Sequence, residues 1–110
     1  MYEQKEIVLM PFPYTDLTSH KVRPALIISN SNLNKTEDRI CCLITSVPIK
    51  DGIEIKNNFI KDGKLPLKSW IKPQRIFTID EKIIKKKLCV ISDEFYDLVL
   101  KEINKYLKGE

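Results

Sequence analysis

The sequence predicts a mainly β domain that ends in one α-helix. Three observations support this fold class: short apolar runs recur along the chain, turn-forming residues interrupt them, and helical spacing occurs only near the C-terminus. Closely spaced strands with no helices between them favour an antiparallel barrel or sandwich over a parallel sheet. The length of 110 residues suits a single domain over residues 1–110.

Three strands are expected in the first half of the chain, at residues 7–12, 23–29 and 39–46. Pro11 and Pro13 end the first strand, because proline cannot donate to a strand ladder. The second strand is apolar without alternation, which predicts burial on both of its faces. The intervening segments 14–22 and 30–38 are polar and rich in turn-forming residues, so both are expected to be loops.

Further strands are expected in the second half, at residues 53–56, 69–73, 75–79 and 88–91. The first of these alternates apolar and polar residues between the turn signals Asp51-Gly52 and Asp62-Gly63, which predicts a half-exposed strand. The two middle segments form one interrupted strand or two short ones. Residues 82–86 suit a single helical turn.

An amphipathic helix is expected after Ser92. Ser92 suits the N-cap, and Asp93 and Glu94 favour the first turn because acidic side chains stabilise the helix dipole there. With one polar exception, apolar residues then follow i, i+3, i+4 spacing, at Phe95, Leu98, Val99, Glu102, Ile103, Tyr106 and Leu107. Lys108 and Gly109 are stop signals.

Composition narrows the classes of function. The net charge of +4 permits an acidic partner such as nucleic acid without requiring one. No apolar stretch approaches the ~20 residues of a membrane span, and no signal segment follows the N-terminus, so we expect a cytoplasmic protein without a membrane partner. Three cysteines and one histidine, without C-x-x-C spacing, indicate buried free thiols and no metal site. Known cofactor motifs are absent, so no cofactor is expected.

Two strand ends carry side chains that suit chemistry on a phosphate. Arg23 enters an apolar strand beside Pro24, and its guanidinium could bind a phosphate from a firmly held base. The alternative is a solvated arginine that closes a strand end. Thr45 and Ser46 end the third strand, where their hydroxyls could donate to an oxyanion in a cleft or could simply cap the strand.

Several segments resemble the MazF/PemK family of toxins. The run Ile7-Val-Leu-Met-Pro-Phe-Pro-Tyr-Thr-Asp-Leu, a polar loop and then Val22-Arg-Pro-Ala-Leu-Ile-Ile-Ser resemble the opening of these proteins. Leu43-Ile-Thr-Ser, the segment 69–80 and the closing helix match in order. The resemblance implies an SH3-like antiparallel barrel and a homodimer with an RNA groove across its interface. It also implies a cognate antitoxin that binds over the groove, with an acidic tail.

The activity implied by this resemblance is sequence-specific, metal-independent cleavage of single-stranded RNA such as mRNA. The RNA 2′-OH attacks the adjacent phosphate and leaves 2′,3′-cyclic phosphate and 5′-OH ends. Arg23 matches the family's catalytic arginine and Thr45 its catalytic hydroxyl residue. His20 is a further catalytic candidate, because an unperturbed histidine pKa lies near neutrality. The expected RNA contacts are Tyr14, Lys21, Ser46, Lys72 and Gln74.

The sequence also departs from the family pattern. The loop 15–22 lacks glycines that many members carry, and Lys72 and Gln74 stand where some members have Arg and Asp. Two other functions remain open: a CcdB-like inhibitor of DNA gyrase that cuts no RNA, and a plain SH3-like interaction module. Arg23 and Thr45 favour the nuclease, because a protein that only binds needs neither.

Overall fold

The computed structural model describes residues 1–11 and 21–109. Its strands are β1 (Glu6–Pro11), β2 (Val22–Ile27), β3 (Asp38–Thr45), β4 (Ile53–Glu54), β5 (Ile60–Gly63), β6 (Trp70–Asp80) and β7 (Lys86–Ile91). Its helices are α1 (Ser31–Asn34) and α2 (Asp93–Leu107), with 3-10 turns η1 (Asn57–Phe59) and η2 (Glu81–Ile83). None of the described helices is both long enough and apolar enough to span a membrane.

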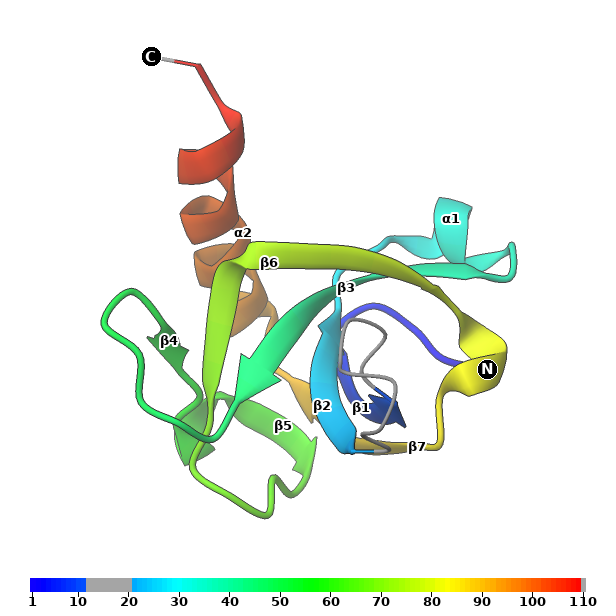
Figure 1. The fold of residues 1–110 in the computed structure, drawn as a ribbon, viewed down its shortest axis with the longest axis horizontal. Coiled ribbons are helices and arrows are strands. Elements are labelled where there is room, and N and C mark those ends of the chain that lie inside the picture. The colour runs from blue at the N-terminus through cyan, green and yellow to red at the C-terminus, as the bar shows by residue number, and fades with distance from the viewer. Residues whose placement is uncertain (12–20, 110) are drawn as a thin grey trace.

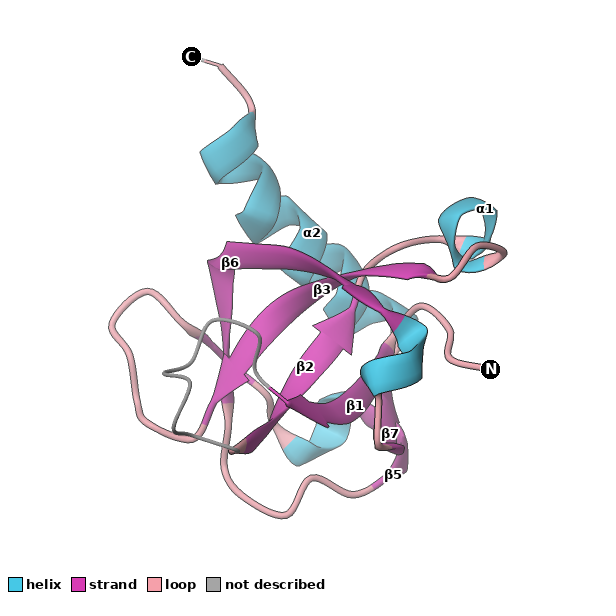
Figure 2. Ribbon diagram, turned by 45° about the vertical axis from the view of Figure 1, so that its right-hand side comes forward, coloured by secondary structure: helices cyan, strands magenta, loops and turns pink. Residues whose placement is uncertain are grey.

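In the part of the chain that the structure describes, the strands form one antiparallel sheet in the order β4-β6-β3-β2-β1-β7-β5. The sheet curls into a partly open barrel (Figure 1). Helix α2 packs along one side of the curl, and its C-terminal end extends past the strands (Figure 2). The expected fold class, an antiparallel barrel with a C-terminal helix, is confirmed.

The central strands are packed on both faces. Ile7 and Cys42 belong to a cluster completed by α2, whereas their neighbours Val8 and Cys41 belong to a second cluster with side chains from β6. Successive side chains of a strand point to opposite faces, so no face of these strands is left for solvent. A slip of one residue would exchange the two sets, and the register is therefore strongly specified.

Strand β6 is a single element of 11 residues, so of the two expected alternatives one strand forms and not two short ones. Its register against β3 shifts between the pairs Cys42–Ile76 and Ile44–Ile71. Pro73 lies within the shifted stretch, where a residue without an N–H group is tolerated. Figure 1 shows β6 bending sharply beside α2, so this strand turns a corner of the barrel.

The C-terminal helix begins as expected. The Ser92 hydroxyl accepts a hydrogen bond from the Phe95 N–H at 3.2 Å and caps α2. Phe95 is fully buried and stacks on Phe59, with ring centroids 4.5 Å apart. The far end differs from the expectation of a packed face, because Tyr106 is 54% exposed and Leu107 is still more exposed.

Three local expectations are wrong. The segment 30–38 is not all loop, because the Asn30 side chain accepts from the N–H groups of Asn32 and Leu33 and so starts α1. Strand β5 was not expected, because the only pattern found in this segment was the turn signal Asp62-Gly63, which lies at the end of the strand. The helical turn expected at 82–86 lies at η2, and β7 already begins at Lys86.

A buried arginine ties three distant segments together. Arg39 is 0% exposed. Its Nε donates to the Tyr2 carbonyl at 2.9 Å, and its Nη1 donates to the carbonyls of Thr36 and Asp38, each at 2.7 Å. Its Nη2 pairs with the Glu81 carboxylate at 2.7 Å. One side chain thus joins the N-terminus, the turn before β3 and η2.

Replacing Arg39 with methionine should lower the free energy of unfolding by roughly 3 kcal/mol or more, because four acceptors lose their donor. Chemical denaturation followed by circular dichroism would measure the change. The exposed Arg75 on β6 provides a matched control, and Arg75→Met should shift the value by about 0.5 kcal/mol or less. Equal effects of the two substitutions would contradict this role of Arg39.

Candidate functional site

A pocket of about 500 Å³ lies where β2 begins and β3 ends. Its lining comes from five parts of the chain: Leu9; Lys21, Val22, Arg23 and Pro24; Ile44, Thr45, Ser46 and Val47; Leu65, Pro66, Leu67 and Ser69; and Leu88. Two segments expected to act together, around Arg23 and around Thr45, therefore meet in one cavity.

The sheet register explains why Arg23 and Thr45 meet. Strands β2 and β3 run antiparallel with Ala25 opposite Leu43. Continuing that register by two residues sets Arg23 opposite Thr45. Arg23 is also paired with Met10 of β1, so the strand that carries it is held on both edges. Because the strand's inner residues are packed on both faces, the start of the Arg23 side chain is firmly positioned.

The Thr45 hydroxyl is oriented by the backbone that follows it. Its Oγ1 accepts a hydrogen bond from the Val47 N–H at 3.1 Å. This contact occupies a lone pair and leaves the hydroxyl proton free to donate to another oxygen. Thr45 is half-buried and Ser46 is exposed at the pocket rim. The site therefore combines a partly buried guanidinium with a preoriented hydroxyl donor.

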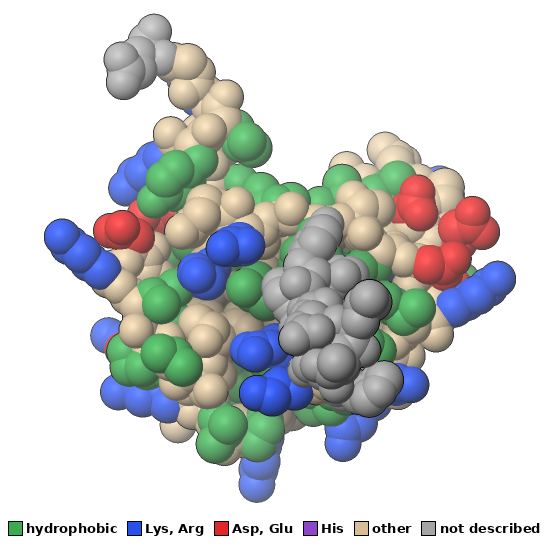
Figure 3. Space-filling model, viewed as in Figure 1, with side chains coloured by type: hydrophobic (Ala, Val, Ile, Leu, Met, Phe, Trp, Pro, Cys, Tyr) green, Lys and Arg blue, Asp and Glu red, His purple; other side chains and the backbone are tan. Residues whose placement is uncertain are grey.

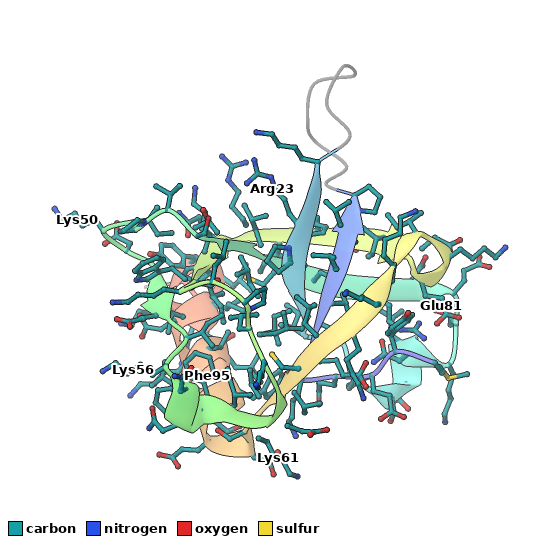
Figure 4. All side chains as sticks on the ribbon, turned by 90° about the horizontal axis from the view of Figure 1, so that it is seen from below. Arg23, Lys50, Lys56, Lys61, Glu81 and Phe95 are labelled. Carbon is teal, nitrogen blue, oxygen red and sulfur yellow. The ribbon has the colours of Figure 1, made fainter. Side chains whose placement is uncertain are left out.

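The electrostatics of the pocket favour an anion. Its described lining contains Lys21 and Arg23 and no acidic residue. Figure 3 shows Lys and Arg side chains over the middle of this face, while Asp and Glu side chains lie towards its two sides, most of them at the right beside α1. In Figure 4, Arg23 lies at the upper edge of the molecule, and Glu81 lies well to the right of it. An anion at Arg23 is thus remote from the acidic end of the molecule.

Two of the expected RNA contacts, Lys72 and Gln74, lie outside the pocket. Lys72 and Gln74 lie on β6 and do not line the pocket; Lys72 is half-buried and Gln74 is exposed. Tyr14 and His20 lie outside the described residues. Within the described lining there is no histidine or carboxylate that could accept a proton near neutral pH.

The apolar wall of the pocket was not found by sequence reasoning. Leu65, Pro66 and Leu67 supply part of it, and Leu67 is 63% exposed. Val47, at 64% exposed, also lines the pocket. The segment 64–68 carries no known motif and no strand pattern, so its two leucines were the available signal of an apolar wall.

The cysteines are poor candidates for chemistry. All three are buried free thiols, as expected. Burial raises the pKa of Cys41 and of Cys42 to about 12 and that of Cys89 to about 11, so each stays protonated at neutral pH. Across residues 1–11 and 21–109, no group of three His, Cys, Asp or Glu side chains could hold a metal ion.

Comparison with known proteins gives a consistent picture. The family model described as the PemK-like, MazF-like toxin of type II toxin–antitoxin systems matches residues 3–107. No curated protein matches the sequence significantly.

Solved structures share the fold at low identity. A mycobacterial endoribonuclease in complex with its cognate antitoxin is similar with a TM-score of 0.78 and 15% identity, over 97% of this chain and 95% of that one. The Mycobacterium tuberculosis toxin MazF-mt6 has a TM-score of 0.74 and 13% identity, over 96% and 98% of the two chains. The Deinococcus radiodurans MazE–MazF structure has a TM-score of 0.72 and 13% identity, over 99% and 97%.

Proposed function

Because the chain belongs to the PemK-like, MazF-like toxin family of type II toxin–antitoxin systems, we propose that it is a cytoplasmic endoribonuclease toxin that cuts single-stranded RNA at a short motif. The observation that carries the proposal is the cavity that joins Arg23 to Thr45 with no acidic residue in its described lining. Such a site suits a phosphate that gains negative charge during reaction.

The proposed reaction uses a nucleophile that the substrate already holds. The 2′-OH gives up its proton and attacks the neighbouring phosphorus, and the bond to the 5′-oxygen breaks. The departing 5′-oxygen takes a proton from water, so that a 2′,3′-cyclic phosphate and a 5′-OH result. An internal nucleophile needs no separate activation by a metal ion, because it is already positioned. Arg23 binds the phosphate oxygens as charge grows on them, and Thr45 donates a further hydrogen bond.

Proton transfer requires a group other than Arg23. A guanidinium stays protonated in proteins and cannot accept the proton of the 2′-OH. We assign this role to His20, which precedes Lys21 and Arg23 by few residues and ordinarily titrates near neutral pH. Its own position lies outside the described residues, so the assignment rests on sequence proximity.

Sequence preference must come from the bases, because the net charge of +4 gives only modest phosphate attraction. Unpaired bases can be splayed out and read at their edges, whereas a duplex hides them. We propose Lys21 and Ser46 at the pocket, and Tyr14, Lys72 and Gln74 beyond its described lining, as the contacts. The amide of Gln74 suits a base edge, since it both donates and accepts.

Two protein partners complete the proposal. We propose a cognate antitoxin whose acidic tail covers the basic pocket and blocks RNA.

We also propose a homodimer, because α2 leaves Leu98, Tyr106 and Leu107 exposed on the described surface. Exposed apolar side chains gathered on one element are typical of an interface.

The purified protein should cut a long single-stranded transcript in the presence of EDTA, with all cuts in one short motif. Paired copies of that motif should resist, because a duplex holds the 2′-OH out of line with the scissile bond. Sequencing the fragment ends measures both. Loss of cutting in EDTA with recovery in Mg²⁺ would refute the metal-free mechanism, and failure to cut any RNA would favour the gyrase-inhibitor or interaction-module reading.

Arg23→Ala should lower kcat for RNA cleavage by roughly 10²-fold or more, since a preorganised charge stabiliser is lost. Single-turnover kinetics at saturating enzyme would report the change. Lys82→Ala removes the same charge from the exposed η2 and should leave kcat near that of the unsubstituted protein. A folded Arg23→Ala variant with a near-normal kcat would rule out Arg23 as the charge stabiliser.

Light scattering at micromolar concentration should report the mass of two chains. Leu98→Asp combined with Tyr106→Asp should shift the protein towards a monomer, because charge is placed on the exposed α2 face. Exposed Lys35→Asp and Thr78→Asp on other elements provide a control with two added carboxylates. A monomeric unsubstituted protein at this concentration would contradict the homodimer.

A further inference from the structure

A second depression borders the pocket that contains Arg23. It has a volume of about 410 Å³ and is lined by Glu54, Ile55, Lys56, Asn57 and the segment Leu65–Lys68. The two depressions share Leu65, Pro66 and Leu67, which form a ridge between them. We propose that the second depression is a binding subsite for single-stranded RNA that flanks the scissile phosphate and crosses this ridge.

The polar groups of the second depression suit a phosphodiester strand. Lys56 and Lys68 are both exposed in it, and Asn57 adds an amide. One carboxylate, on Glu54, lies 3.6 Å from the Lys68 ammonium. Two cations against one anion leave an excess positive charge. An exposed pair at this distance is worth about 1 kcal/mol or less, so a phosphate can compete for Lys68.

The ridge is firmly anchored at both ends. At its start, Gly63 has φ +84, and a Cβ there would lie 2.5 Å from the Leu88 carbonyl oxygen, so only glycine fits. At its end, the buried Ser69 hydroxyl donates to the Leu67 carbonyl at 2.8 Å, and the Ser69 carbonyl accepts from the Ile55 N–H at 2.9 Å. These contacts hold the backbone on either side of Leu65–Leu67 and so keep the apolar ridge in place between the two depressions.

An apolar crest between two cationic depressions matches the alternation of base and phosphate in RNA. The exposed Leu67 offers an apolar surface to the face of a base, while phosphates on either side reach Arg23 and Lys56. Figure 4 shows Lys56 and Lys50 on one side of the molecule and Glu81 on the other, with Arg23 between them. A strand leaving Arg23 towards Lys56 thus moves away from the acidic end.

RNA fits this surface better than a protein segment does. The antitoxin tail would also be attracted by lysines, but a peptide does not present an anion at every repeat. The subsite deepens the proposed nuclease function and rests on it, since the strand enters from the catalytic pocket.

The test removes both cations and compares long with short RNA. Lys56→Gln with Lys68→Gln should raise KM for the long transcript by roughly 10-fold and leave kcat unchanged. The salt dependence of binding should weaken by about 0.7 in log–log slope for each lost phosphate contact on a single strand. An oligonucleotide trimmed to the nucleotides on either side of the cleaved bond should bind both proteins equally.

The matched control is Lys35→Gln with Lys82→Gln, which removes the same charge from exposed sites near the acidic end. The subsite is wrong if the control raises KM as much, if the trimmed oligonucleotide is affected equally, or if only antitoxin binding weakens. A 2′-deoxy substitution at the cleaved position separates the two proposals. If the lysine substitutions lower the salt-dependence slope on this RNA but no RNA is ever cut, the second depression binds RNA and the nuclease proposal fails. If the substitutions leave the slope unchanged while RNA is cut normally, the nuclease proposal holds and the subsite is wrong.

Discussion

The packing of the central strands on both faces is the constraint on which the rest of the structure depends. Ile7 and Val8 enter different clusters, as do Cys41 and Cys42, so neither β1 nor β3 can slip without exposing a core. Arg23 and Thr45 sit at the ends of strands held in this way. Their juxtaposition is therefore a consequence of apolar packing several residues away, and the chemical groups contribute little to it.

The strong local patterns were predictable from sequence, and the non-local contacts were not. Continuous apolar runs located β1 to β3, and the Ser92 cap with 3.6-residue spacing located α2. The burial of Arg39 depends on carbonyls from Tyr2 and Thr36, which no local pattern brings together. The ridge at Leu65–Leu67 was missed for a related reason, because the two depressions that it borders are completed by residues from distant parts of the sequence.

Several acidic side chains lie away from the pocket. Glu37, Asp38, Asp80 and Glu81 lie at the end that carries α1 and η2, where Arg39 is fully occupied by carbonyls and one carboxylate. The pocket end carries Lys21 and Arg23 without a described acidic neighbour in the lining. The described charged residues of the pocket lining are thus all basic, and they attract a polyanion to this end of the molecule.

In the ridge, the residues that hold the fold differ from the residues that face a ligand. Gly63 leaves room for the Leu88 carbonyl, and the Ser69 hydroxyl donates to the Leu67 carbonyl. The Leu67 side chain, which lies between these two positions, faces solvent. Exposed positions away from such contacts tolerate substitution with small changes in stability. Pro66 and Leu67, both exposed, can thus diverge between related chains and reshape the wall of both depressions, whereas Leu65 packs against the core and is held by it.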